Sequence, residues 1–308
     1  MAIYDASGNP LFLSEYANVM DYGAYGNGRV DDADAIQAAV DSLRVTGGVI
    51  YFPQGTYLLS KAIIFYSRQM LWFANGATLL QSGTMNNIIR AYMDSNCDAY
   101  NGVHDSVIYG GTFDAGENAY QSTLAGVAHC KNIIFENCTF KNGTGSWHDL
   151  EICASYNVKV INCDFEAHNR DNINGEMIQI DGGGGSYPWG GFVIDNTVSQ
   201  YIDISGCIFH DSTKAPAIGT HTDMAHKFIR IHDNIFDGIT TTHSAIYFTS
   251  SVSDVDIHDN TFNNCTDGIG SEGSTYYIHD NRFVDVTTAI RGSTSVVHDN
   301  MINGAYVA

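Results

Sequence analysis

A repeated pattern runs through most of the chain and limits the folds open to it. Each copy is a short stretch of alternating apolar and polar residues, then a polar turn, then a large apolar residue. The residues that end the copies are Phe113, Phe140, Phe165, Phe209, Phe236, Phe262, Phe283 and Ile302, at steps of 27, 25, 44, 27, 26, 21 and 19 residues. Such a period is typical of stacked units, because one unit cannot bury its apolar face alone.

The period inside each copy is that of a β-strand. Residues 132–140 (NIIFENCTF), 157–165 (NVKVINCDF) and 228–236 (FIRIHDNIF) place apolar residues at every second position, whereas a helical repeat needs a period of 3.6. The chain has 31 glycines and 4 prolines, which fits many tight corners and few interrupted strands. The sequence therefore predicts an all-β fold, a right-handed parallel β-helix: a single-stranded solenoid with three short sheets.

One segment ahead of the repeats has helical spacing instead. The acidic residues 31–34 (DDAD) precede Ile36 and Val40, and a Gly-Gly pair at 47–48 supplies a stop. We expect an N-capped amphipathic helix over about residues 32–46. It would cover the first rung, because an open sheet edge invites aggregation.

We expect the whole chain, residues 1–308, to form a single β-helix domain. Residues 1–48 would form an N-terminal cap that includes the helix, and residues 49–308 would form the rungs. The one irregular step, of 44 residues, predicts an insertion loop over about residues 182–200. Long loops that interrupt a regular scaffold are disproportionately functional.

Three stretches near the N-terminus carry a family resemblance. They are residues 19–28 (VMDYGAYGNG), 31–39 (DDADAIQAA) and 47–57 (GGVIYFPQGTY). Together they resemble the opening of the pectate-lyase superfamily, in the branch shared by polygalacturonase-like enzymes and phage tailspike depolymerases. The resemblance implies a carbohydrate-active β-helix. The catalytic signatures of the polygalacturonases and of the pectate lyases are absent from the rungs, so no catalytic residue is carried over from the resemblance.

Although those catalytic signatures are absent, the stacking of the rungs predicts where a functional site lies. Strands that begin at Leu150, Ile178, Ile218, Ile246, Ile269 and Ile290 align by their inward residues. One outward column then contains Glu151, Gln179, Gly219, Tyr247, Gly270 and Arg291, and the next contains Cys153, Asp181, His221, Thr249, Glu272 and Ser293. Because rungs lie about 4.8 Å apart, the predicted catalytic residues are Asp181, Glu176, Glu151, His221 and His148. Gly219 would leave space for a ligand.

Loops beside this column supply the predicted substrate contacts. Tyr187 and Trp189 in the insertion offer flat rings on which sugars stack. The full set of predicted substrate-binding residues is Gln179, Trp189, Tyr187, Asp171, Arg170, Asp223 and Tyr247. Asp171 and its neighbours could position substrate or a Ca²⁺ ion. No other cofactor is expected, and no zinc-like spacing or nucleophile motif is present.

The predicted reaction is depolymerisation of a polysaccharide by glycoside hydrolysis with paired carboxylates. Retaining enzymes need a separation of about 5 Å and inverting ones about 6.5–9.5 Å, and the hydrolytic β-helices that the chain resembles favour inversion. The first alternative is a lyase, in which His221 or His148 removes the proton beside a uronate carboxylate, with or without calcium. The second is a non-catalytic glycan-binding or structural β-helix on a phage tail or cell surface.

Charge and hydropathy exclude nucleic acid and membrane as partners, and the family resemblance implies a polysaccharide. The net charge of −20 lacks the cationic surface that nucleic-acid binding needs, and no apolar run reaches the roughly 18 residues of a membrane span. The chain opens without the features of a secretory signal peptide. The tailspike resemblance implies an extracellular protein, either secreted or carried on a phage virion, with a homotrimer as a candidate assembly.

Three further columns are expected to be structural. Cys138, Cys163 and Cys207 share one position of the repeat, which predicts buried thiols rather than disulfides. Asparagines occupy that position on later rungs: Asn234, Asn260, Asn281 and Asn300. Histidines precede them at the corner: His232, His258, His279 and His298. These columns predict a hydrogen-bonded amide ladder and a histidine ladder.

Overall fold

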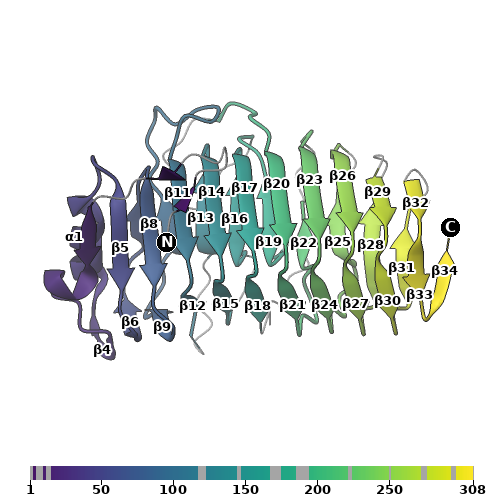
Figure 1. The fold of residues 1–308 in the computed structure, drawn as a ribbon, viewed down its shortest axis with the longest axis horizontal. Helices are drawn as coiled ribbons and strands as arrows, with labels where there is room; N and C mark the ends of the chain where they lie inside the picture. The colour runs from purple at the N-terminus through teal and green to yellow at the C-terminus, as the bar shows by residue number, and fades with distance from the viewer. Residues whose placement is uncertain are drawn as a thin grey trace.

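A computed structural model describes residues 3–4, 10–11, 15–116, 123–143, 147–166, 175–184, 194–220, 224–249, 251–271, 276–292 and 296–307. Within these residues the chain winds as a coil whose strands form three sheets, parallel except for the antiparallel last pair of one sheet, as Figure 1 shows from the side. A two-stranded antiparallel pair, β1 (Ile3–Tyr4) and β2 (Pro10–Leu11), stands apart from them. The predicted parallel β-helix is confirmed.

The three sheets run the length of the coil. Sheet 1 has nine strands: β7 (Ile63–Phe65), β10 (Asn87–Ala91), β13 (Thr123–Ala128), β16 (Leu150–Cys153), β19 (Ile178–Asp181), β22 (Ile218–Gly219), β25 (Ser244–Phe248), β28 (Asp267–Ser271) and β31 (Thr288–Arg291). Sheet 2 has eleven: β3 (Tyr16–Asn18), β5 (Gly48–Phe52), β8 (Gln69–Phe73), β11 (His104–Tyr109), β14 (Lys131–Glu136), β17 (Tyr156–Ile161), β20 (Gln200–Ser205), β23 (Lys227–His232), β26 (Ser253–His258), β29 (Tyr276–His279) and β32 (Val296–His298). Sheet 3 has twelve: β4 (Asn27–Asp31), β6 (Gly55–Leu59), β9 (Ala77–Gln81), β12 (Thr112–Asp114), β15 (Thr139–Lys141), β18 (Asp164–Glu166), β21 (Ile208–His210), β24 (Ile235–Asp237), β27 (Thr261–Asn263), β30 (Arg282–Val284), β33 (Asn300–Ile302) and β34 (Ala305–Val307).

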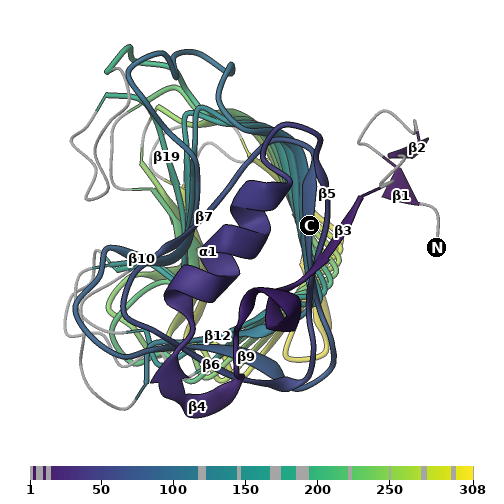
Figure 2. The same ribbon diagram turned by 90° about the vertical axis from the view of Figure 1, so that its left-hand side faces the viewer.

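The N-terminal helix covers the first rung. Figure 2 looks along the coil and shows α1 (Ala33–Ser42) lying across the space between the sheets. The helix is shorter than expected, since the chain turns at Leu43. Its first N–H group is capped by Asp31, whose Oδ1 accepts from Ala33 N at 3.1 Å. A short 3-10 helix, η1 (Val19–Tyr22), precedes it.

Strand pairing begins inside the segment that the sequence assigns to the cap. β3 pairs with β5 and β4 pairs with β6, so both strands belong to the sheets of the coil. No helix in the described part of the chain is long and apolar enough to span a membrane.

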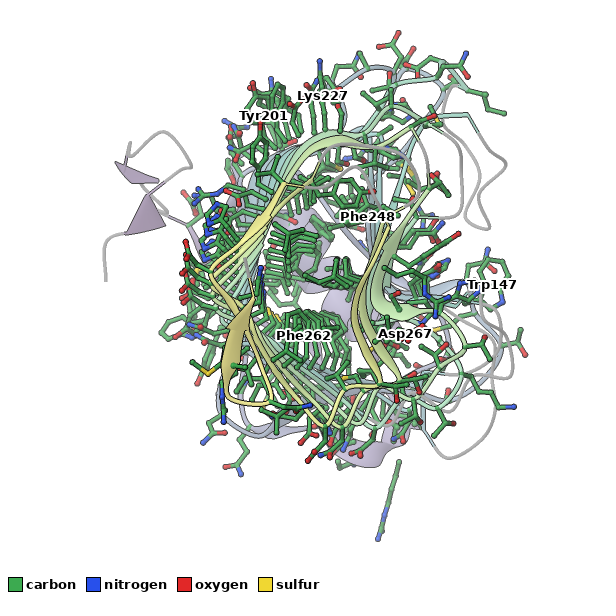
Figure 3. All side chains as sticks on the ribbon, turned by 90° about the vertical axis from the view of Figure 1, so that its right-hand side faces the viewer. Trp147, Tyr201, Lys227, Phe248, Phe262 and Asp267 are labelled. Atoms are coloured by element: carbon green, nitrogen blue, oxygen red, sulfur yellow. The ribbon has the colours of Figure 1, made fainter. Side chains whose placement is uncertain are left out.

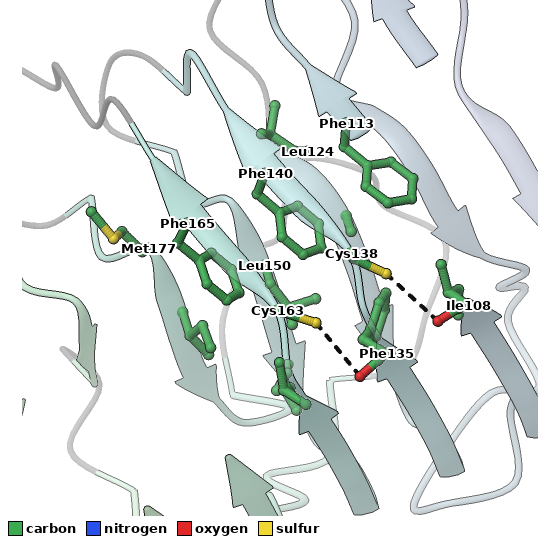
Figure 4. Packing of buried hydrophobic residues seen from close by; sticks show 14 of the residues in the cluster. Ile108, Phe113, Leu124, Phe135, Cys138, Phe140, Leu150, Cys163, Phe165 and Met177 are labelled. Atoms are coloured by element: carbon green, nitrogen blue, oxygen red, sulfur yellow. Dashed lines mark hydrogen bonds between the residues drawn. The ribbon is translucent and has the colours of Figure 1, made fainter. Parts of the chain in front are cut away.

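The repeated phenylalanines form the core. Phe113, Phe140, Phe165, Phe209, Phe236, Phe262 and Phe283 are fully buried. Consecutive rings are stacked with centroids 4.6–5.1 Å apart. Figure 3 shows this stack end on at Phe262, and Figure 4 shows three of its members. Each ring is therefore covered by the rungs on both sides.

All seven cysteines are buried free thiols, as the sequence predicts for Cys138, Cys163 and Cys207. The thiols of Cys138 and Cys163 donate to the carbonyl oxygens of Ile108 and Phe135 (Figure 4). Burial raises the pKa of the Cys163 and Cys207 thiols well above the ordinary value. Because the thiolate is the reactive form, these thiols are structural.

The asparagine ladder continues the cysteine column. Cys207 N donates to Asn234 Oδ1 at 2.8 Å, Asn234 N to Asn260 Oδ1 at 3.0 Å, and the same contact recurs up to Asn300. At the preceding corner the rings of His232, His258, His279 and His298 are stacked 5.0–5.1 Å apart. Both predicted ladders are confirmed.

Substitution of one rung of the amide ladder has a predictable cost. Asn260 is 1% exposed, accepts from Asn234 N and donates Nδ2 to Ile231 O at 2.8 Å. Asn260→Ala leaves these buried groups without partners, at about 1–3 kcal/mol each, so we expect at least about 2 kcal/mol lost in urea unfolding. The matched control, Asn75→Ala at an exposed turn, should change stability by less than about 0.5 kcal/mol. Equal effects of the two variants would contradict a structural role for the ladder.

Candidate functional site

The predicted site lies on the outer face of sheet 1, and strand register decides which residues share it. Glu151 pairs with Gln179, Gln179 with Gly219, and Gly219 with Tyr247. Tyr247 pairs with Gly270, and Gly270 with Arg291. This is the outward column that the sequence predicts. In the next column Cys153 pairs with Asp181, while the predicted neighbour His221 lies outside the described residues.

The three predicted acids of this region are buried, and so is Asp149 directly before β16. Glu151 is 3% exposed, Glu176 2% and Asp181 5%, and His148 beside them is 5% exposed. Glu151 and Asp181 lie on β16 and β19, and Glu176 directly precedes β19. Because Leu150, Ile152, Ile178 and Ile180 belong to the core, the alternation of each strand directs Glu151, Gln179 and Asp181 away from it. Acids are almost never fully buried without a specific reason.

Each carboxylate has its own partners. Asp181 accepts from Gln179 Nε2 at 3.1 Å and from Gly182 N at 2.8 Å. Glu151 accepts from Thr123 Oγ1 at 3.4 Å and from the Cys153 thiol at 3.2 Å. These two donors to Glu151 are neutral, and these two donors to Asp181 are amides.

Glu176 is held by a histidine and a glycine. His148 Nδ1 lies 3.2 Å from the backbone oxygen of Glu176 and 3.5 Å from its Oε2. An added Cβ at Gly219 would lie 3.0 Å from Glu176 Cγ and 2.7 Å from the Tyr247 carbonyl oxygen. The expectation that Gly219 leaves space for a ligand is therefore wrong, because the Glu176 side chain occupies that space.

Several predicted residues cannot be placed. His221, Asp223, Tyr187, Trp189, Asp171 and Arg170 lie outside the described residues. The two ends of the insertion are described, and they are joined by hydrogen bonds from Gly183 N to Thr197 O and from Asp195 N to Gly183 O. In the described part of the chain, no group of three or more His, Cys, Asp or Glu side chains could hold a metal ion.

Besides Asp149, four residues near the site were missed by sequence reasoning. Thr123 lies on β13, whose apolar sequence (TLAGVA) gave no signal of a polar contact. His243 precedes β25, and its ring lies 4.8 Å from that of Tyr247. Trp147 precedes β16, and Figure 3 shows it on the outer side of sheet 1. The fourth, Arg90, shares a column with Glu151.

Arg90 adds a cation to the outward column. It pairs with Gly126, which pairs with Glu151, so Arg90 lies two rungs from that carboxylate. Burial lowers the pKa of the half-buried Arg90 guanidinium, but arginine stays charged in proteins. Its rung lies ahead of the regular repeats, so strand pairing, not the sequence pattern, places Arg90 in this column. The site therefore combines buried acids with a nearby cation, and Arg291 lies five rungs from Glu151 in the same column.

Comparison with known proteins agrees with the fold. Residues 16–211 match the family model described as rhamnogalacturonase A/epimerase, pectate lyase-like. Residues 190–308 match a model described as periplasmic copper-binding protein (NosD).

Two curated relatives align with most of the chain. The plasmin and fibronectin-binding protein A of Streptococcus pneumoniae is 29% identical over 80% of this chain and 39% of its own length. The pre-neck appendage protein of Bacillus phage B103 is 27% identical over 93% of this chain and 28% of its own length. The chain thus spans well under half of either relative.

Two solved structures share the fold. The S. pneumoniae surface adhesin PfbA has a TM-score of 0.73 at 22% identity and covers 94% of this chain and 77% of its own. An exopolygalacturonase from Thermotoga maritima has a TM-score of 0.68 at 14% identity and covers 98% and 81%. At these identities the likeness concerns the fold alone, and function must be argued from the site.

Proposed function

This chain belongs to the rhamnogalacturonase A/epimerase, pectate lyase-like family, and we propose that it cleaves a polysaccharide at the carboxylate site of sheet 1. The proposed reaction is glycoside hydrolysis. The observation that carries it is the burial of Glu151, Glu176 and Asp181 on neighbouring rungs. Taking charges out of water is costly, and the coil needs no acid in the Glu151 column, since Gly126 and Gly219 occupy the same column.

The spacing of Glu151 and Asp181 favours an inverting mechanism. Asp181 is offset from Glu151 by one rung, about 4.8 Å, and by two residues along the strand, about 6.6 Å. Their Cα atoms are therefore about 8 Å apart. An inverting enzyme needs its carboxyl groups, rather than their Cα atoms, about 6.5–9.5 Å apart to leave room for a water molecule, and a Cα spacing of about 8 Å allows that separation.

The hydrogen bonds suggest a role for each acid. Asp181 accepts two N–H groups, as an ionised carboxylate does, which suits a base that activates water. Glu151 is the acid that protonates the leaving oxygen, and its neutral partners suit either protonation state. Glu176, held by His148, positions the substrate. In this assignment Asp181 and Glu151 are the catalytic pair.

A panel of polysaccharides tests the proposal. We expect the protein to release reducing ends from at least one bacterial or plant polysaccharide without producing the ultraviolet absorbance of unsaturated uronates. New ends of inverted anomeric configuration, read by proton NMR before mutarotation, would support the Glu151–Asp181 pair. A panel on which the protein binds a glycan and releases no ends contradicts hydrolysis.

A second candidate function is β-elimination on a uronate polymer. Arg90 favours it, because a guanidinium binds a carboxylate through two parallel hydrogen bonds and this one shares the Glu151 column. His148 would then serve as the base. Ends and absorbance that rise together in the same panel would identify this reaction.

The names of the aligned relatives, a plasmin and fibronectin-binding protein and a phage appendage protein, support a place outside the cell, on a cell surface or a virion. These names also support a binding role without cleavage, and the same polysaccharide panel tests it. Binding without either product would assign the chain a non-catalytic function.

A further inference from the structure

A groove lies on the outer side of sheet 2, away from the carboxylates of sheet 1. Its volume is about 510 Å³, and its walls come from β17, β20, β23, β26 and β29. Its aromatic lining residues are Tyr201, Phe228 and Tyr277, and its charged lining residues include Lys159, Asp203, Arg230 and Asp256. We call this surface the aromatic groove. The carboxylates of sheet 1 are not part of it.

The backbone beneath the two rings has an unfavourable conformation. The second residue of six consecutive sheet 2 strands has a φ of 52–57°. These residues are Asp105, Asn132, Asn157, Tyr201, Phe228 and Asp254. Asn and Asp tolerate this left-handed region, whereas a bulky side chain there is an outlier. Tyr201 and Phe228 therefore replace the residue type that the backbone favours.

Burial of the two rings does not offset the backbone strain at Tyr201 and Phe228. Tyr201 is 44% exposed and Phe228 37% exposed, and Figure 3 shows Tyr201 and the adjacent Lys227 on the outside of the coil. The two rings are stacked with centroids 4.7 Å apart and planes at 26°. Rings stacked at this distance cover one face of each other, so this two-rung platform presents ring edges and outer faces to solvent. Residues kept in strained conformations cluster at functional sites.

Charges beside the platform alternate in sign. Lys159 pairs with Asp203, Asp203 with Arg230, and Arg230 with Asp256. Arg230 Nη1 lies 3.9 Å from Asp203 Oδ2, and Asp256 Oδ1 lies 3.1 Å from His279 Nε2. The charges nearly cancel, so this row does not select a strongly charged polymer. It offers donors and acceptors at each rung, which suits a ligand rich in hydroxyl groups.

We propose that the aromatic groove binds a neutral glycan. The C–H groups of a sugar would pack against the exposed edges and outer faces of Tyr201 and Phe228, while its hydroxyl groups bond to Asp203, Arg230 and Asp256. A neutral chain is favoured over an acidic one because the protein carries a net charge of −20, which repels polyanions at long range. This binding does not depend on the cleavage proposed for sheet 1.

The test replaces both rings by the residue that neighbouring rungs use. Tyr201→Asn with Phe228→Asn removes the platform and suits the left-handed backbone, so the unfolding midpoint should stay the same or rise. Affinity gel electrophoresis would compare dextran, galactomannan and mixed-linkage β-glucan with polygalacturonate. We expect at least one neutral polymer to retard the wild type, and the double variant to bind it at least about tenfold more weakly.

A control pair lies on the same two rungs. Ile208 and Ile235 are both 41% exposed on sheet 3 and pair with each other, so Ile208→Asn with Ile235→Asn removes similar apolar surface and should not alter retardation. The inference is overturned if no neutral polymer retards the wild type, or if both double variants bind alike. It is also overturned if sedimentation shows a wild-type oligomer that only the Tyr201/Phe228 variant dissociates, because the face would then join copies of this chain.

Discussion

Asp181→Asn is expected to lower the rate of polysaccharide cleavage by about 10²–10⁴-fold, the usual contribution of a positioned acid or base. The variant keeps the shape of the side chain and an oxygen to accept from Gly182 N, but it cannot remove a proton from water. Glycan binding and the unfolding midpoint should change little. The measurement is the initial rate of reducing-end release on the polymer identified by the panel.

Two further variants separate this role from a general loss of charge. Asp237→Asn removes a half-buried carboxylate from β24 of sheet 3 and should leave the rate unchanged. Glu151→Gln should slow cleavage of the polymer, yet lose much less on an aryl glycoside whose leaving group needs no proton. If Asp181→Asn cleaves the polymer at the wild-type rate, the assignment of Asp181 as the base is wrong.

Phe209→Ala is expected to destabilise the coil by about 3–5 kcal/mol. The ring is fully buried and is stacked on Phe165 at 4.8 Å and on Phe236 at 4.9 Å. Its loss leaves a cavity at the interface of three rungs, and solenoid stability depends on contacts between neighbouring rungs. Equilibrium unfolding in urea, followed by circular dichroism, measures the loss.

The control for the core is an aromatic residue on the surface. Tyr25 is 64% exposed, and Tyr25→Ala should cost less than about 0.5 kcal/mol. Phe209→Leu should fall between the two, because leucine fills part of the cavity. Similar midpoints for Phe209→Ala and Tyr25→Ala would contradict a core carried by the phenylalanine stack.

Much of the predicted site depends on register, and register could be read from the sequence. Ile178 and Ile218 face the core in the aligned strands, so Gln179 and Gly219 had to share the outward column. The same reasoning placed Asn260 between Asn234 and Asn281. A one-residue slip would turn every core side chain outward, so the apolar pattern allows only one alignment.

The side chains around that column were less predictable. The sequence suggested open space above Gly219, which has no side chain. The Glu176 side chain, which comes from a residue before β19, fills that space. Arg90 lies on a rung whose repeat is too irregular to align by eye, so its place in the Glu151 column emerged only from strand pairing. These contacts depend on the paths of loops and on side-chain rotamers, and neither follows a repeating pattern in the sequence.

The sequence by itself determined the coil, its core and its ladders, because strand alternation and a repeat near 25 residues leave one way to bury the apolar face. Only the tertiary structure decided that Glu151, Glu176 and Asp181 are buried and that Tyr201 and Phe228 stand exposed on left-handed backbone. The alternation of apolar and polar residues along a strand tells which face of the sheet each side chain occupies. Burial and backbone strain are set by segments distant in sequence, so they appear only once the rungs are stacked.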